Sequence, residues 1–137
     1  CDLSNANLAG TSFKSVRFKD CKLLGLHFDD CNPFLLSFQF DGCILNFSIF
    51  YNLKLKSTLF KNCQVQDVDF TEADLTNALF QECDLQNAVF DQTNLEGADL
   101  RTATSFSIDP ARNRLKKARF SSQNITGLLD GLGIRID

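Results

Sequence analysis

The sequence has 137 residues, 23% of them charged, and a net charge of −3 at pH 7. This length fits one domain, and the sequence contains neither an apolar run of ~18 residues that could span a membrane nor a secretory signal pattern. The first residue, Cys1, already lies within a repeating pattern. We therefore expect the chain to be truncated or processed at its start.

The pattern repeats every five residues. Between Ala73 and Leu100, Leu or Phe stands at every fifth position, and a small residue stands two places before each. Neither an α-helix nor a flat strand brings every fifth side chain to one buried side. A solenoid does so when each five-residue unit forms one side of a coil and a turn leads to the next side.

Cysteine spacing gives the length of one coil, because most cysteines of the repeat are 20 residues apart. The step from Cys21 to Cys43 is 22 residues and indicates a two-residue insertion near residues 29–34. After the insertion we expect the frame to resume at Leu35, as a core residue. Coils of about 20 residues, stacked ~4.8 Å apart, predict an all-β solenoid: a four-sided β-helix.

Counting in coils places the large apolar residues in columns that face the interior, with small residues beside them. The predicted core stacks consist of Phe40, Phe60, Phe80, Phe50, Phe70, Phe90, Leu55, Leu75, Leu95, Cys43, Cys63 and Cys83. Cysteines in such a ladder are expected to be buried and reduced, to form no disulfide and to bind no metal. This expectation favours a cytoplasmic protein.

The regular units end after residue 103. Asp109-Pro110 is a turn signal, and Phe120 restores the large residue of the pattern, so we expect an excursion over 104–117 in a β-helix that spans 1–120. Residues 121–137 predict a short helix and a strand. Their apolar residues are Ile125, Leu128, Leu129, Leu132, Ile134 and Ile136. This segment either caps the last coil or forms a dimer interface.

The units ADLTN, CDLQN, ADLRT and ANLAG resemble the pentapeptide-repeat family over about residues 1–103. The resemblance implies a right-handed quadrilateral β-helix. The tail is similar to the C-terminal helix and strand through which the Qnr and MfpA proteins of this family pair, which implies a homodimer joined through 121–137. Those proteins resemble duplex DNA in size, shape and charge, and bind DNA gyrase or topoisomerase IV.

Charge is divided unevenly along the chain. Residues 1–61 carry +2, residues 62–100 carry −9 and residues 101–137 carry +4. The acidic residues of the middle segment are Asp67, Asp69, Glu72, Asp74, Glu82, Asp84, Asp91, Glu96 and Asp99. They either follow the preference of the repeat for Asp near turns or form a functional acidic rod. Two features depart from the Qnr pattern: the basic residues 112–119 would dilute the acidic field, and long projecting loops are missing.

Several apolar residues around the insertion occupy non-central positions. They are Phe34, Leu36, Phe47, Ile49 and Tyr51. Either they pack locally around the insertion or they form an apolar patch that binds a protein.

Catalytic chemistry has little support in the sequence. The only histidine, His27, is expected on the surface without a catalytic partner, and we find no phosphate-binding loop, nucleophile motif or cofactor site. The first hypothesis is a non-enzymatic, dimeric DNA mimic that binds a type II topoisomerase and lowers quinolone sensitivity. The second is an interaction scaffold for an unrelated protein. In neither case do we expect a cofactor, direct binding to nucleic acid or a membrane partner.

Overall fold

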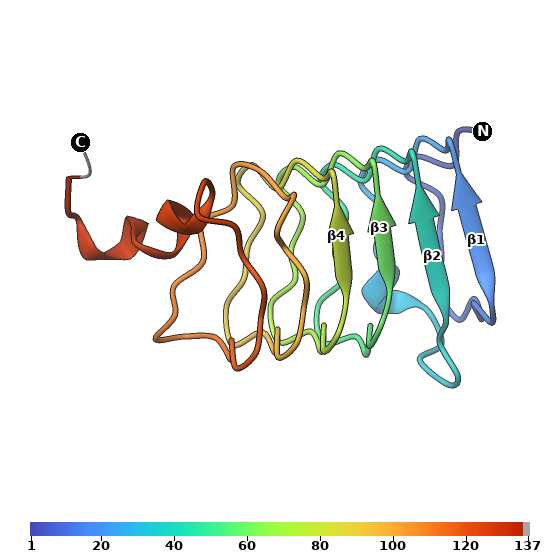
Figure 1. The fold of residues 1–137 in the computed structure, drawn as a ribbon. Coiled ribbons are helices and arrows are strands. Elements are labelled where there is room, and N and C mark those ends of the chain that lie inside the picture. Colours follow the sequence, from blue (N-terminus) through green and yellow to red (C-terminus); the bar gives the residue numbers. More distant parts are fainter. Residues whose placement is uncertain (136–137) are drawn as a thin grey trace.

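The computed structural model describes residues 1–135. The chain winds into a solenoid whose N-terminus and C-terminus lie at opposite ends (Figure 1). Strands β1 (Val16–Lys19), β2 (Phe38–Asp41), β3 (Leu59–Lys61) and β4 (Leu79–Gln81) form one parallel sheet in that order. The other parts of each coil pair through single parallel bridges. A β-helix solenoid of pentapeptide units is therefore the architecture of the chain.

The paired residues of the described chain, 1–135, fall on four ladders, which we call sides 1 to 4. Side 1 contains Asp2, Lys22, Ile44, Gln64, Asp84 and Thr104. Side 2 contains His27, Ile49, Asp69 and Val89. Side 3 contains Ser12, Asn32, Lys54, Asp74, Asn94 and Arg114. Side 4 contains the strands β1 to β4, followed by Asp99 and Arg119.

A β-turn joins each regular side to the next, and this explains the period of five. The N–H of Leu53 donates to the carbonyl oxygen of Phe50 across such a turn, at 3.3 Å. The third residue of the turn, Asn52, has a φ of 57°. A type II turn needs a positive φ at this place, which Gly, Asn and Asp adopt most readily. The polar residues of the repeat therefore have a geometric role in addition to solvation.

Parallel phenylalanine rings fill the interior. The ring centroids of Phe50 and Phe70 lie 5.3 Å apart with an interplanar angle of 11°, and those of Phe60 and Phe80 lie 4.8 Å apart at 2°. Rings in neighbouring columns meet edge to face, as Phe50 and Phe60 do at 87°. Each residue of the core stacks that we deduced from the sequence is at most 6% exposed. The rise of one coil thus matches the distance at which aromatic rings stack.

The two-residue insertion forms a loop that projects below β2 (Figure 1). Asn32 still pairs with Ser12, and Phe38 is the next residue to enter the core. Leu35 is 65% exposed, so the prediction that it belongs to a core stack was wrong. The extra residues leave the coil after Asn32, and Phe38, which pairs with Val16 on side 4, packs its ring 5.6 Å from the ring of Phe13.

The last coil keeps the spacing of 20 residues. Thr104 pairs with Asp84, and Arg114 pairs with Asn94. The N–H of Gln92 donates to the carbonyl oxygen of Arg112, so the chain leaves the ladders only over 105–111.

The segment after Phe120 folds against the last coil through two 3₁₀ helices. These are η2 (Ile125–Leu128) and η3 (Asp130–Leu132), and a third 3₁₀ helix, η1 (Phe28–Asp30), lies earlier in the chain. The side-chain amide of Asn124 donates to the carbonyl oxygens of Leu100 and Ala103, at 2.8 and 3.0 Å. None of the helices in residues 1–135 has the length and hydropathy needed to cross a membrane.

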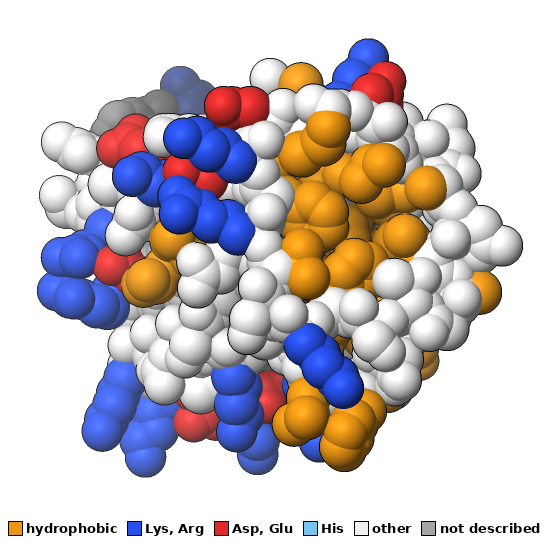
Figure 2. Space-filling view, turned by 90° about the vertical axis from the view of Figure 1, so that its right-hand side faces the viewer, with side chains coloured by type: hydrophobic (Ala, Val, Ile, Leu, Met, Phe, Trp, Pro, Cys, Tyr) orange, Lys and Arg blue, Asp and Glu red, His pale blue; other side chains and the backbone are white. Residues whose placement is uncertain are grey.

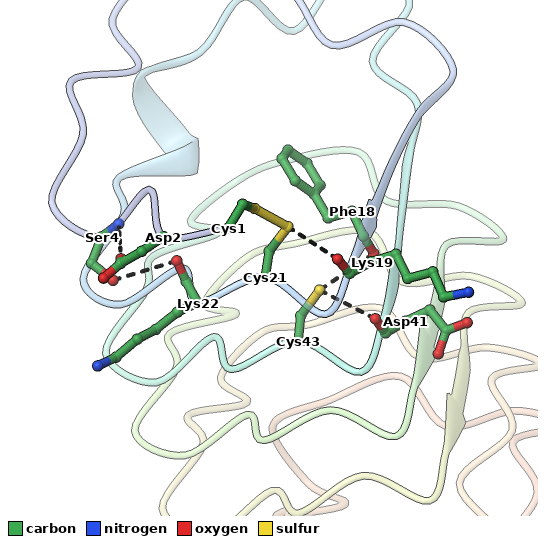
Figure 3. The surroundings of a disulfide bond; sticks show 9 residues. All are labelled: Cys1, Asp2, Ser4, Phe18, Lys19, Cys21, Lys22, Asp41 and Cys43. Atoms are coloured by element: carbon green, nitrogen blue, oxygen red, sulfur yellow. Dashed lines mark hydrogen bonds between the residues drawn. A yellow bond between two sulfur atoms is a disulfide. The ribbon is translucent and has the colours of Figure 1, made fainter.

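A disulfide joins Cys1 and Cys21 near the N-terminus (Figure 3). Residues 20 apart are neighbours on adjacent coils, and the two Cα atoms are 4.8 Å apart, within the range of disulfides. The expectation that no cysteine pair forms a disulfide was therefore wrong. Cys31, Cys43, Cys63 and Cys83 are free and buried. The hydrogen bond with Cys63 and burial raise the pKa of Cys43, so this thiol stays protonated.

Phe47 gives a test of the turn geometry, because this aromatic residue has a φ of 66°. Its side chain is 63% exposed, so a substitution removes little packing. A left-handed conformation is unfavourable for Phe and is tolerated better by Asn. We expect Phe47→Asn to raise the free energy of unfolding by about 0.5–1 kcal/mol in urea denaturation. Phe34→Asn is the control, since Phe34 is 64% exposed without a positive φ. An equal effect of both substitutions would show that loss of the exposed ring, and not backbone strain, is responsible.

Gly127 gives a test of the C-terminal packing. A Cβ at this position would overlap the carbonyl oxygen of Phe106 and lie 2.6 Å from its ring. We expect Gly127→Ala to destabilise the segment by about 1–3 kcal/mol and to speed hydrogen exchange at the amide of Ile108, which donates to Gly127. Gly131→Ala should have little effect, because its Cβ would meet no atom closer than 3.9 Å. Unchanged exchange at Ile108 in the first variant would contradict this account.

Candidate interaction surfaces

The described chain presents one open groove and several charged and apolar surfaces. An open groove of about 480 Å³ lies between the last coil and the C-terminal segment, lined mainly by hydroxyl and amide side chains. Within residues 1–135, no group of three His, Cys, Asp or Glu side chains is placed to hold a metal ion. His27 is exposed, with its Nδ1 atom 3.6 Å from Oδ1 of Asp29. The charged and apolar surfaces are therefore the features to compare with the predictions.

Four of the nine acidic residues of the middle segment lie close to basic side chains. The closest contacts are a bidentate pair between Asp91 and Arg112, at 2.8 and 3.0 Å, and a contact of 2.8 Å between Asp99 and Arg101. Longer contacts join Glu96 to Arg114 and Asp74 to Lys56, at 3.9 and 4.0 Å. The hydrogen bond from Arg112 holds the pKa of Asp91 below its ordinary value, and that from Arg101 does the same for Asp99.

The basic tail supplies two of these partners because it forms the next coil. Arg112 and Arg114 belong to the coil that stacks on residues 91–96, so their side chains reach the carboxylates one coil away. The basic residues therefore weaken the acidic field by direct contact with the carboxylates of Asp91 and Glu96.

Several of the aspartates also shape the backbone. Asp69 accepts hydrogen bonds from the N–H of Thr71 at 2.8 Å and from its hydroxyl. Asp84 accepts one from the amide side chain of Gln66 at 2.7 Å. These hydrogen bonds support a structural role for Asp in the repeat. Asp69 and Asp84 nevertheless remain partly exposed to solvent.

The acidic residues without a nearby cation lie mostly on one part of the perimeter. Asp84 is on side 1, Asp67 is in the turn to side 2, Asp69 is on side 2 and Glu72 is in the turn to side 3. Within residues 1–135, no basic side chain lies within 4 Å of these four carboxylates. Glu82, in the turn between sides 4 and 1, also has no such pair. The acidic surface is therefore one-sided.

The structure does not bring the apolar residues around the insertion into one patch. Phe34 lies in the loop between sides 3 and 4, Phe47 in the turn between sides 1 and 2, and Tyr51 in the turn between sides 2 and 3. Leu36 and Ile49 are partly buried. We group these residues in the sequence because they are close along the chain. In the fold, successive turns point away from the solenoid axis in different directions.

The apolar residues of the C-terminal segment differ in exposure. Ile125, Leu132 and Ile134 are exposed, whereas Leu128 and Leu129 are partly buried, with Leu128 packed against the core. Ile134 is not in a strand, and the predicted contact residue Ile136 lies outside the described residues.

The sequence reasoning missed a basic surface, because it divided charge along the chain and not around the coil. The side chains that share side 3 and the turn to side 4 are Lys14, Lys54, Lys56, Arg114, Lys116 and Lys117, which we call the basic edge. Numbering each residue by its place in the coil would have revealed the alignment of Lys14, Lys56 and Lys116.

Comparison with known proteins supports the repeat. A family model described as pentapeptide repeat region matches residues 1–70 and 32–100. The chain belongs to the pentapeptide repeat family. No curated protein matches it.

Solved structures of this family share the fold. A trypsin-treated variant of QnrB1, described as a plasmid-mediated fluoroquinolone resistance protein, superposes with a TM-score of 0.64 at 20% identity. The match covers 100% of this pentapeptide repeat chain and 66% of that one, so the chain spans just under two thirds of its neighbour. A pentapeptide repeat protein from the Arabidopsis thaliana thylakoid lumen matches with a TM-score of 0.50 at 26% identity, covering 56% of this chain and 52% of that one.

The pair between Asp91 and Arg112 gives a test of how the last coil neutralises its neighbour. We expect Arg112→Gln to raise the pKa of Asp91 toward its ordinary value, measured by carboxyl NMR titration. The folded pKa lies below the unfolded one, so the pair stabilises the fold above the unfolded pKa and is lost as the pH falls through the folded pKa. The variant should therefore lose less stability in acid. Arg101→Gln, the control, should shift Asp99 and leave Asp91 unchanged; a shift of both would argue for a general field effect.

Proposed function

We propose that this protein is a non-enzymatic interaction solenoid of the Qnr type, which binds DNA gyrase or topoisomerase IV in place of DNA and lowers quinolone sensitivity. The observation that carries the proposal is the one-sided surface formed by Asp67, Asp69, Glu72 and Asp84 on a straight, rigid rod. The similarity to QnrB1 extends over the whole chain, and it supports the fold rather than the activity.

The physical argument concerns the density of charge. Coils rise by ~4.8 Å, so the four carboxylates fall within roughly 10 Å of axis. Duplex DNA carries one negative charge per ~1.7 Å, from both strands. One face of the rod therefore presents a charge density of the same order as the part of a duplex that faces a protein. Asp91 and Asp99 are paired with Arg112 and Arg101, so the resemblance to duplex DNA is restricted to sides 1 and 2.

The proposal includes the form and assembly expected for Qnr-like proteins. The coil would be right-handed and quadrilateral, and the segment 121–135 would cap it. A homodimer would form through the exposed residues Ile125, Leu132 and Ile134, which places the acidic coils of two copies on either side of the joint. The protein would act in the cytoplasm, where topoisomerases act.

A second candidate is a scaffold for an unrelated protein. Phe47 and Tyr51 are exposed in the two turns that border side 2 in one coil. A hydrogen bond with Glu72 raises the pKa of Tyr51. Two exposed aromatic residues on a rigid frame are typical anchors of protein interfaces.

The test is inhibition of DNA supercoiling by purified gyrase across a series of salt concentrations. We expect inhibition at micromolar protein that weakens as salt rises. Asp67→Lys with Glu72→Lys should raise the concentration for half inhibition at least about tenfold, since both turns face the acidic side. Protection of gyrase from quinolone poisoning should fall in parallel.

The matched control is Glu82→Lys with Glu96→Lys, which makes the same change in net charge in turns beside side 4. This pair should retain inhibition within about threefold. Loss of equal size in both double variants would mean that only net charge matters. No inhibition of either topoisomerase by the wild-type protein would remove the mimicry proposal, whereas loss of a pulled-down partner in Phe47→Ser and Tyr51→Ser would favour the scaffold.

A further inference from the structure

The projecting loop carries two large apolar side chains that the fold does not use. Phe34 and Leu35 are 64% and 65% exposed, while the core is closed by Phe38. Leu35 has a φ of 54°, a left-handed conformation that is unfavourable for leucine. This φ is the one that recurs in the turns of the solenoid, so the loop places a large apolar side chain where other turns have Asn, Ser or Gly, and holds it in the solvent.

The apolar tip lies in line with the basic edge. The turns between sides 3 and 4 form a column along the solenoid, which begins with Lys14, continues with the loop, and includes Lys56, Lys116 and Lys117. The Nζ atom of Lys14 lies 5.5 Å from the centroid of the Phe34 ring. From Lys14 to Lys116 the column spans five coil steps, or about 24 Å.

Most cations of this edge are available to a partner. Of its six basic side chains, only Lys56 and Arg114 have a carboxylate within 4 Å among residues 1–135, at 4.0 Å from Asp74 and 3.9 Å from Glu96. Even with both carboxylates counted, the edge carries a net charge of +4. Lys14, Lys54, Lys116 and Lys117 are all exposed.

The view along the solenoid axis shows how the charges are arranged around the perimeter. In Figure 2, which looks at the N-terminal end, Lys and Arg side chains gather along the left and lower rim, on the side of strands β1 to β4 and toward the loop. The right-hand rim of this view shows none. The lower rim thus shows both cations and exposed apolar side chains, and further cations lie at the left and upper rims.

We propose that the basic edge and the projecting loop bind the surface of an anionic lipid membrane. The cations of the edge, with Thr76 and Glu96 between Lys56 and Lys116, contact anionic headgroups, while Phe34 and Leu35 enter the boundary between headgroups and acyl chains. The phosphates of a nucleic acid would engage the lysines and would not require the apolar pair Phe34 and Leu35, whereas a membrane surface uses both features. The acidic sides 1 and 2 point away from such a membrane, so this binding is independent of the function proposed above.

Binding to a membrane surface differs from what the sequence leads us to expect. We expected no membrane partner, because the sequence contains no segment that could span a bilayer. Binding at the surface requires no such segment, and only the fold brings the apolar pair into line with lysines that are up to 83 residues away in the chain.

The absence of tryptophan from the sequence permits a direct test. Phe34→Trp places one fluorophore at the tip, and Phe47→Trp places one at a turn between sides 1 and 2 with almost the same exposure. With vesicles of phosphatidylcholine and about 30% phosphatidylserine, we expect a blue shift of the emission for Trp at 34 and none at 47. Vesicles of phosphatidylcholine alone should give no shift at either position.

Sedimentation with the same vesicles separates the contributions of charge and tip. Lys116→Glu with Lys117→Glu should lower the partition coefficient at least about tenfold, and Phe34→Ser with Leu35→Gly at least about fivefold. The control for charge is Lys22→Glu with Lys61→Glu, which makes the same charge change outside the basic edge. The control for the tip is Phe47→Ser. Both control variants should bind within about twofold of wild type.

Three results would overturn the proposal. The first is failure of the wild-type protein to bind the anionic vesicles at low salt. The second is an equal loss of binding in the control variants, which would reduce the effect to net charge. The third is tight binding of short duplex DNA that depends on Lys116 and Lys117 and not on Phe34, which would assign the edge to nucleic acid.

Discussion

The structure depends on a turn that recurs every five residues with one residue in the left-handed conformation. Each turn sets the direction of the next side, and the stacking of coils lets backbone N–H and carbonyl groups of one coil pair with those of its neighbours. Because the coil rise equals the stacking distance of aromatic rings, the same repeat also closes the core with Phe columns. One local rule thus sets the backbone path, the hydrogen bonds and the packing.

The same geometry sets where side chains can act. In a solenoid, residues one coil apart are neighbours, so Asp91 meets Arg112 and Phe34 meets Lys14. Pairing along the axis neutralises some carboxylates and leaves others free, and the result is a rod with an acidic part and a basic edge. The surface of this protein is therefore best described around its perimeter, where the two kinds of charge are separated, and not by its small net charge.

Departures from the repeat occur where the regular geometry is not needed. The insertion adds Phe34 and Leu35 outside the coil, and the segment 105–111 leaves the ladders near the C-terminal end. Asn124 and Gly127 then hold the final segment against the last coil by hydrogen bonds and by a close approach to Phe106. These local exceptions distinguish this chain from a uniform array of pentapeptides, and one of them carries the apolar tip formed by Phe34 and Leu35.

The sequence alone determined the period of five, the coil of 20 residues and the buried columns, because each follows from the spacing of large and small residues along the chain. It could not show that Leu35 stays outside and Phe38 enters, since both fit an apolar position and only packing decides between them. The disulfide between Cys1 and Cys21, the pair of Asp91 with Arg112 and the line of lysines at one edge were decided by the tertiary structure. Each depends on which side chains of adjacent coils point the same way, and that is fixed only when the coils are stacked.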